Sequence, residues 1–320
     1  MIRYAKVFII NLMVYCVYLN PTIDKTVYCK RFVFGGTNRP HKVIVEGAGK
    51  AVNVAAALAL MGVPVRVAGF VCSGGADAIR NKLERCGVQY TFRELDGYAR
   101  VNTKIFDGET QTVTEINEQG PEVGEEDLAW LEGYLLEHAG ADDTAVLTGS
   151  MPRGVPESCY AQLIEKLNEK GVRCVLDAGG EALRLGAEQG PYMIQPNLDE
   201  LEAAYGHAKH SLDVLRDICD GIIRLGVQVV TVTLGAEGVV VFGKEGAYTA
   251  QAPEVEVLST VGAGDALAAG MVAQIGRPLD EMLRHGVAAA TAAVASEGTG
   301  LGDQELYIKY LDQVKIKDFK

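Results

Sequence analysis

The sequence predicts an α/β fold in which a mostly parallel central sheet carries helices on both faces and a small β-sheet lid. From residue 48 onward, short β-rich runs alternate with segments of helix length, which is typical of a parallel sheet. Runs such as 229–234 are almost continuously apolar or β-branched, as expected for strands buried on both faces. Two other stretches, 26–45 and 100–116, are β-rich and contain no helix.

A core strand is expected at residues 15–19, and further strands of the main sheet follow it. They are residues 64–70, 145–148, 174–177, 192–195, 229–234 and 239–242. The expected helices are residues 50–61, 76–86, 125–138, 157–170, 212–225, 263–275 and 280–296. Because the 320 residues contain no repeat, low-complexity segment or linker, we expect a single domain.

The two helix-free stretches predict a second sheet over one edge of the domain. In the first, Gly35-Gly36-Thr37-Asn38 joins two β-rich pieces, and in the second Asp107-Gly108-Glu109 gives a strong hairpin signal. We expect a lid formed by about residues 20–45 and 99–117, which would exclude water from a site beneath it. Such an exposed sheet also offers a contact surface for a homodimer.

Charge and cysteine content narrow the classes of function. A formal net charge of −12 disfavours nucleic acid or an anionic membrane surface as the main partner. No later apolar run approaches the ~20 residues of a transmembrane helix. The seven cysteines are odd in number and none forms a C-x-x-C pattern, which indicates reduced thiols in a cytoplasmic protein.

Residues 1–12 are expected to be a dispensable N-terminal extension. Two basic residues precede an apolar run, as in a signal peptide, but no small-residue cleavage site follows. Met13 directly precedes the first core strand, so it is the expected natural start. The alternative is a genuine extension that packs on the surface.

Polar and glycine-rich segments follow the expected strands, where parallel α/β sheets bind ligands. These segments are 20–24, 47–53, 149–152, 196–200, 235–238 and 262–265. Packing alone does not explain glycines and polar side chains at so many strand ends. The sequence therefore predicts a ligand site at this edge of the sheet.

The segment Gly262-Ala263-Gly264-Asp265 joins a β-branched run to a small apolar helix. Glycines here let backbone N–H groups point outward, and a helix N-terminus attracts anions, so the segment can cradle a phosphate. A carboxylate beside a phosphate makes sense if Asp265 takes a proton from an attacking hydroxyl. The alternative is that Asp265 merely caps the helix.

Three motifs, in order, resemble the ribokinase-type sugar kinases of the PfkB family. They are Gly49-Lys50-Ala51-Val52-Asn53, Asn197-Leu198-Asp199-Glu200 and Gly262-Ala263-Gly264-Asp265. The resemblance runs from about Val14 to the C-terminal helices and implies a three-layer ribokinase-like fold, ATP as donor and Mg²⁺ as cofactor. Segments 20–24, 100–102, 114–118 and 149–154 resemble the subgroup that phosphorylates sugar phosphates, with 1-phosphofructokinases nearest and tagatose-6-phosphate kinases next.

The resemblance also implies site residues. The catalytic base is Asp265, and the anion hole is formed by Gly262, Ala263 and Gly264. The sugar-phosphate side comprises Asp24, Gly49 and Asn53 for the sugar, Lys50, Arg100, Asn102 and Ser150 for its phosphate, and Glu115 on the lid. The ATP side comprises Asn197, Thr233, Gly235 and Gly238, with Asn197 and Glu200 positioning Mg²⁺ through water.

Several of these residues have a purely structural alternative. Asp24 could simply form a turn after Pro21, and Arg100 could be a solvated charge at the lid edge. Asn197 and Glu200 have the spacing of a helix capping box, which is compatible with a metal role.

Three positions depart from the family pattern. Ala51 stands where relatives have Gly, Ala56 where the phosphosugar subgroup usually has Arg, and Gln195 where Lys usually precedes Pro-Asn. The last two remove positive charge near a ligand.

The expected function is phosphorylation of a ketose phosphate, foremost fructose 1-phosphate to fructose 1,6-bisphosphate. Alternatives are tagatose 6-phosphate, a nucleoside or a neutral sugar as substrate, or a non-catalytic sugar-phosphate sensor. Lys50 and Arg100 count against a neutral substrate, and the intact 262–265 segment counts against a sensor.

Overall fold

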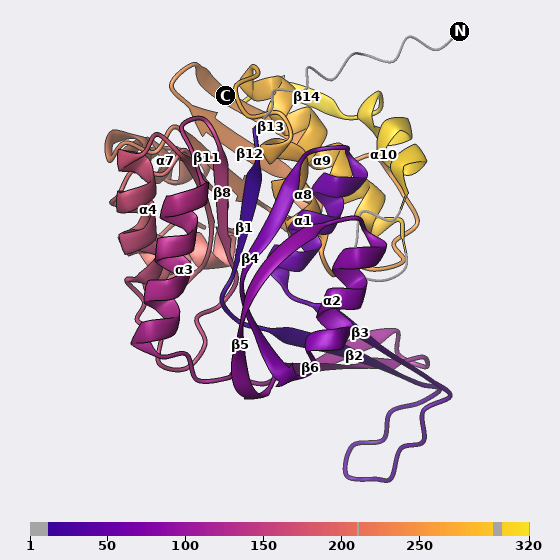
Figure 1. The fold of residues 1–320 in the computed structure, drawn as a ribbon. Helices are drawn as coiled ribbons and strands as arrows, with labels where there is room; N and C mark the ends of the chain where they lie inside the picture. Colours follow the sequence, from indigo (N-terminus) through magenta and orange to yellow (C-terminus); the bar gives the residue numbers. More distant parts are fainter. Residues whose placement is uncertain (1–11, 210, 297–302, 320) are drawn as a thin grey trace, which may run out of the picture.

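The computed structural model describes residues 12–209, 211–296 and 303–319. Within them, the main sheet has ten strands in the order β14-β13-β12-β11-β10-β9-β8-β1-β4-β5. Figure 1 shows helices α3, α4 and α7 on one side of this sheet and α1, α2, α8 and α9 on the other. The α/β class with helices on both faces is thus confirmed. Of the expected N-terminal extension, residues 1–11 lie outside the described residues.

The central strands of the main sheet run parallel. They are β1 (Val14–Tyr18), β4 (Val65–Gly74), β5 (Gln89–Tyr98), β8 (Thr144–Thr148), β9 (Arg173–Asp177), β10 (Met193–Ile194) and β11 (Val229–Thr233). Every residue of β1 and β8 is buried, because helices cover both faces of the sheet there. Three antiparallel strands complete the far edge: β12 (Val239–Gly243), β13 (Gly246–Gln251) and β14 (Lys315–Asp318).

The helices follow the strands in alternation. They are α1 (Lys50–Leu60), α2 (Ala76–Arg85), α3 (Glu125–His138), α4 (Cys159–Glu169), α5 (Gly180–Ala187), α6 (Leu198–Tyr205), α7 (Leu212–Arg224), α8 (Ala263–Val272), α9 (Leu279–Val294) and α10 (Gln304–Leu311). The small residues of α8 have a packing reason. A Cβ atom on Gly270 would lie 2.4 Å from the carbonyl oxygen of His285, so only glycine permits this approach of α8 to α9.

Several elements were not expected from the sequence. The expectation omitted β5, β13 and β14 of the main sheet, and helices α5, α6 and α10. Strand β5 is mostly exposed or half-buried at the edge of the sheet, and β14 is a charged edge strand, so neither has the apolar run that marks a buried strand. Helices α5, α6 and α10 are only eight residues long, which is too short for a clear helical period.

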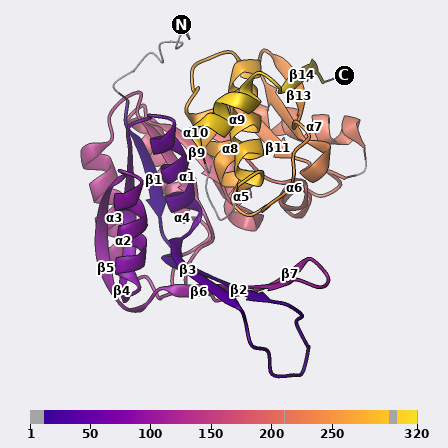
Figure 2. The same ribbon diagram turned by 90° about the vertical axis from the view of Figure 1, so that its right-hand side faces the viewer.

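Four strands form a second, smaller sheet in the order β3-β2-β6-β7. They are β2 (Thr22–Cys29), β3 (Lys42–Ala48), β6 (Arg100–Asp107) and β7 (Thr112–Asn117), so both helix-free stretches contribute. Strands β2 and β6 pair in parallel, with Asp24 opposite Asn102, and the outer pairs are antiparallel. Figure 2 shows this sheet projecting below the main domain, beneath the carboxyl-terminal half of the chain.

Two further observations concern the described part of the chain. None of its helices combines the length and apolar character that crossing a bilayer would require. All seven cysteines are free thiols, and six of them are buried. The exception is the exposed Cys86 at the end of α2.

Candidate active site

Two adjoining pockets form one cleft between the small sheet and the carboxyl ends of the main strands. Their linings share Gly49, Lys50, Arg100, Asn102, Asn117 and Glu200, so the two are continuous. The cleft brings together the expected residues Asp24, Gly49, Lys50, Asn53, Arg100, Asn102, Glu115, Ser150, Asn197, Glu200, Thr233, Gly262, Gly264 and Asp265. It also includes three residues that the sequence analysis did not assign to the site, Lys104, Asn117 and Asp177, and it includes Gln195, which was expected only as a departure from the family pattern near a ligand.

Gly235 and Gly238 do not line the cleft. Gly235 begins a 3₁₀ turn after β11 and Gly238 directly follows that turn, and both have positive φ angles. A Cβ atom on Gly238 would lie 2.2 Å from the carbonyl oxygen of Ala250, so glycine is required for the turn to pass β13. The turn nevertheless adjoins the cleft, because Thr233 lines it and forms a β-bridge with Asn197.

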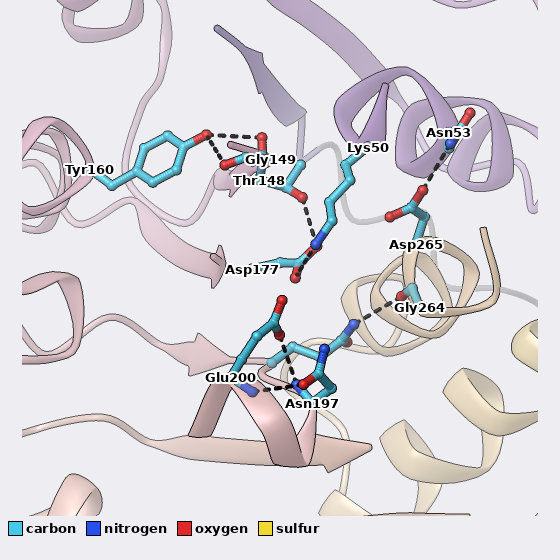
Figure 3. A network of polar contacts seen from close by, with 11 residues as sticks. Lys50, Asn53, Thr148, Gly149, Tyr160, Asp177, Asn197, Glu200, Gly264 and Asp265 are labelled. Atoms are coloured by element: carbon cyan, nitrogen blue, oxygen red, sulfur yellow. Dashed lines mark hydrogen bonds and ion pairs between the residues drawn. The ribbon is translucent and has the colours of Figure 1, made fainter. Parts of the chain in front are cut away.

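Asp265 is the third residue of α8, which follows a left-handed glycine. Gly262 has φ +81° and is the N-cap of the helix, and the first N–H groups of α8 have no partner within the helix. The Asp265 carboxylate is buried and accepts a hydrogen bond from Nδ2 of Asn53 at 2.8 Å. Its side chain is directed at Asn53 on α1 rather than at its own helix, which argues against a mere cap (Figure 3).

The surroundings of Asp265 favour its protonated form more than water does. The pKa of this carboxyl is raised to about 6, chiefly by burial and also by the charge of Asp177. The cations Lys50 and Lys82 and the hydrogen bond from Asn53 oppose that rise. A carboxyl group with this pKa can accept a proton near neutral pH and release it again.

Lys50, at the start of α1, forms an ion pair with Asp177 at the end of β9. The distance from Lys50 Nζ to Asp177 Oδ1 is 3.0 Å, and Thr148 Oγ1 donates to the other carboxylate oxygen at 2.7 Å. Asp177 is the main cause that raises the pKa of Lys50, and Asp265 and Glu200 add to it. In Figure 3 the Lys50 side chain extends between Asp177 and Asp265. The one signal for Asp177 in the sequence is a polar residue that ends an apolar strand.

One face of the small sheet points into the cleft. Side chains opposite one another in paired strands share a face, and Asp24 pairs with Asn102, Asn102 with Asn117, and Lys104 with Glu115. All five line the cleft. Nζ of Lys104 donates to Oδ2 of Asp24 at 2.6 Å, and both side chains are buried. Asp24 is therefore paired in the sheet as well as placed in the cleft.

Arg100 reaches across from the small sheet to the main domain. Its Nε donates to Oγ1 of Thr22 at 2.8 Å, and its Nη1 donates to Oγ of Ser150 at 3.1 Å. Burial lowers the pKa of this guanidinium group. No carboxylate of the described residues forms an ion pair with Arg100, so its positive charge is available to an anion in the cleft. This arrangement argues against a merely solvated charge.

Asn197 and Glu200 form a reciprocal capping box at the start of α6. Asn197 Oδ1 accepts the backbone N–H of Glu200 at 2.8 Å, and Glu200 Oε2 accepts that of Asn197 at 2.9 Å. The expected structural alternative is thus correct. Both residues also line the cleft, and the Glu200 carboxylate extends toward Asp177 in Figure 3. Carboxylate and amide oxygens are the protein ligands that suit Mg²⁺, so the donor set fits a metal bound largely through water.

Gln195 precedes this box at the end of β10. Its Nε2 donates to the carbonyl oxygen of Gly264 at 2.9 Å, which ties the start of α8 to the main sheet. Its Oε1 is buried and has no hydrogen-bond partner among the described residues. Gln195 lines the cleft, so a ligand or water there can satisfy that oxygen.

Comparison with known proteins agrees with this arrangement. The family model described as pfkB family carbohydrate kinase matches residues 16–305, which is most of the chain. The chain belongs to the pfkB family. This carbohydrate kinase is 34% identical to the 1-phosphofructokinase of Bacillus subtilis over 307 residues, which cover 95% of this chain and 99% of the relative. It is 31% identical to the 1-phosphofructokinase of Haemophilus influenzae, with 93% of this chain and 96% of that protein covered.

The pfkB kinase also resembles solved structures over nearly its full length. Phosphofructokinase-2 of Escherichia coli, crystallised in complex with substrates and products, superposes with a TM-score of 0.90 at 27% identity. The match covers 94% of this chain and 99% of that one. The expected ribokinase-like architecture, with a small sheet beside a large mostly parallel one, is therefore confirmed.

Proposed function

We propose that this pfkB kinase transfers the γ-phosphoryl group of ATP to a hydroxyl of fructose 1-phosphate, giving fructose 1,6-bisphosphate and ADP. One observation carries the proposal: Asp265 and Arg100 lie in the same cleft. Asp265 is buried, has a pKa of about 6 and lies at a helix start that can bind an anion. Arg100 forms no ion pair with a carboxylate of the described residues. The first residue supplies a base, and the second supplies a partner for a phosphate already on the sugar. The names of the relatives support the same substrate.

In the reaction, Asp265 accepts the proton of the attacking hydroxyl. The hydroxyl oxygen forms a bond to the γ-phosphorus, and the bond from that phosphorus to the leaving ADP oxygen breaks. Asn53 holds the carboxylate in place through its 2.8 Å hydrogen bond. A positioned base of this kind typically contributes ~10²–10⁴ to the rate.

Negative charge on the transferred group is stabilised by the start of α8 and by Lys50. The backbone N–H groups of Ala263 and Gly264 have no partner within the helix, so they can donate to phosphoryl oxygens. Lys50 can shift from Asp177 toward the same oxygens, because nearly half of its side chain is exposed. Bound Mg²⁺ supplies further charge neutralisation, and Asn197 and Glu200 are the residues that would hold it through water.

The sugar phosphate lies between the small sheet and the start of α1. Asp24, Gly49 and Asn53 would contact its hydroxyls, and Glu115 lies near it on β7. Arg100, Asn102, Ser150 and Lys50 would contact its phosphate. The adenine nucleotide lies on the side of Thr233 and the turn that contains Gly235 and Gly238. The small sheet, residues 22–48 and 100–117, then acts as the lid that keeps water from the reacting groups.

The outer face of the small sheet supports a homodimer. Alternate residues turn away from the cleft. Val27, Val43 and Ile105 form one apolar row across this face, and in the next row Lys25 and Thr103 lie between Val45 and Ile116. Val43, Val45 and Ile116 are each about half exposed, so the face offers large apolar side chains beside a lysine to a partner. One neighbour of similar fold is a tetrameric form of phosphofructokinase-2. Val45→Asp should convert a dimer to a monomer in sedimentation experiments, and an unchanged mass would exclude this interface.

A coupled ADP-release assay tests the proposed substrate. The purified kinase is offered ATP and Mg²⁺ with fructose 1-phosphate, fructose 6-phosphate, tagatose 6-phosphate, fructose or a nucleoside. We expect the highest kcat/KM with fructose 1-phosphate and product that carries a second phosphate. A preference for tagatose 6-phosphate or for a neutral acceptor would replace the proposed substrate. Binding of sugar phosphates without any turnover would favour the sensor alternative.

A further inference from the structure

A buried lysine lies behind the catalytic carboxylate. Lys82 of α2 is only 9% exposed, although lysine is almost never buried without a partner. Its Nζ donates to Oδ1 of Asn53 at 3.1 Å, and Nδ2 of Asn53 donates to Oδ2 of Asp265 at 2.8 Å. The three side chains therefore form a hydrogen-bonded relay from α2 through α1 to α8.

The chemistry of the relay allows only one orientation of the Asn53 side chain. An ammonium group has donors and no acceptor, so it requires the amide oxygen of Asn53. The amide nitrogen is thereby turned toward Asp265, where it donates to the carboxylate. With the amide reversed, its oxygen would face a carboxylate and its nitrogen would face an ammonium group, and neither contact would be a hydrogen bond. Lys82 thus fixes the direction in which Asn53 presents its N–H group.

We propose that Lys82 is a positioning residue of this kinase, which acts through Asn53 to hold the Asp265 carboxylate in the orientation that accepts the proton. The inference rests on the proposed role of Asp265 as the base. Lys82 does not line the cleft, so it acts on the reaction without touching the substrate. Neither the sequence expectation nor the family motifs include it.

The charges around the relay support the same role. Lys82 is near Glu46 of β3, Asp24 of β2 and Cys86 of its own helix, as well as Asp265. Burial lowers the pKa of Lys82, whereas these acidic groups raise it. Asp265 in turn faces Lys50 of α1 and Asp177 of β9, in addition to the relay. The positive charge of Lys82 lowers the pKa of Asp265, so its loss should leave the base protonated at a higher pH.

The test compares three substitutions at one position. Lys82→Met keeps the length and apolar stem of the side chain but removes both donor and charge. Lys82→Gln keeps a donor without charge, and Lys82→Arg keeps both. Lys166→Met is the control, because Lys166 lies on α4 and pairs with Glu132, outside the cleft.

We expect Lys82→Met to lower kcat by about tenfold or more, within the range that a misplaced general base costs. The KM values for ATP and for the phosphosugar should change less than threefold. The acidic limb of the kcat/KM profile should move to higher pH, and Lys82→Arg should restore both kcat and the limb. Lys82→Gln should restore kcat in part but leave the limb displaced. The control should match the unsubstituted kinase in all these measurements.

A measurement without turnover separates this inference from the proposed function. The carboxyl carbon of Asp265, followed by NMR in the ligand-free kinase, should titrate at a higher pH in Lys82→Met than in the unsubstituted protein. If the NMR titration moves but kcat does not, the relay exists and Asp265 is not the base. If neither moves in a folded Lys82→Met or Lys82→Gln variant, Lys82 has no positioning role. Should the Met variant not fold, the Gln and Arg pair gives the same comparison of charge.

Discussion

Nδ2 of Asn53 lies 2.8 Å from Oδ2 of Asp265, although 212 positions separate the two residues in the chain. Each belongs to a helix that starts at the cleft, Asn53 to α1 and Asp265 to α8, and these helices pack against each other. The motifs near the two ends of the sequence are therefore one structural unit. Neither motif alone would place the Asp265 carboxylate beside the start of α1.

Replacing the base should abolish turnover and spare the fold. Asp265→Ala removes the proton acceptor, so kcat should fall by roughly 10²–10⁴. ATP affinity, measured by calorimetry, should stay within a few-fold of the unsubstituted value, since the N–H groups of the α8 start remain. Retention of more than a tenth of kcat by a folded variant would overturn the assignment.

The pH dependence of the kinase should show an acidic limb that belongs to Asp265. Its pKa is raised to about 6, so the base becomes protonated at a higher pH than an ordinary aspartate. The value of kcat/KM should therefore fall as pH decreases through about 6, with a slope of one on a logarithmic plot. A profile that stays flat down to pH 4.5, at saturating Mg²⁺, would contradict a base with this pKa.

Burial of the Asp265 carboxylate should lower the free energy of unfolding of the kinase at neutral pH. A carboxyl group whose pKa is higher in the folded state than in the unfolded state favours folding when protonated, so stability declines as pH rises from about 4 to about 6. Asp265→Asn keeps the acceptor for Asn53 without the charge. We expect it to be more stable at pH 7 by roughly 1–3 kcal/mol, an advantage that disappears below pH 4. Equal urea midpoints for both proteins at pH 7 would exclude this cost.

Loss of Arg100 should weaken binding of the phosphosugar selectively. Arg100→Met keeps the apolar stem and removes a guanidinium group that has no carboxylate partner in the described chain. The KM for the sugar phosphate should rise tenfold or more, because a charge-assisted contact to phosphate is lost, while the KM for ATP should change little. The matched Lys50→Met variant should lower kcat as well, because Lys50 also interacts with Asp265. A rise mainly in the ATP KM would show that the two subsites are reversed.

The sequence predicts the parts of this molecule that depend on local pattern. Buried strands such as β8 and β11, and helices such as α3, follow from periodicity within one segment. The glycine at position 262 and the carboxylate at 265 are recognisable because their chemistry depends on neighbours in the chain. The edge strands β5 and β14 lack that pattern, because one side of each has no neighbouring strand.

The remaining site residues could not be predicted because their roles depend on contacts across the fold. In the sequence, Lys104 is one charged residue of a β-rich stretch. Only the register of β6 against β2 shows that its ammonium group contacts Asp24. From the sequence, Lys82 is expected to be a surface lysine of an amphipathic helix. Only the packing of α2 beside α1 shows that it contacts Asn53. Asp177 ends an apolar strand without any motif around it. Single-segment patterns carry no information on such partners.

The alternation of side chains along β6 decides which of its residues reach the cleft. Arg100, Asn102 and Lys104 face the cleft, whereas Val101 and Thr103 face away from it. A shift of one residue in the pairing of β6 with β2 would exchange these two sets while leaving the strand able to pair. A shift of two residues would keep the polar set in the cleft, displaced along the strand. We therefore expect an insertion that shifts β6 by one residue to abolish binding of the sugar phosphate while leaving the fold intact.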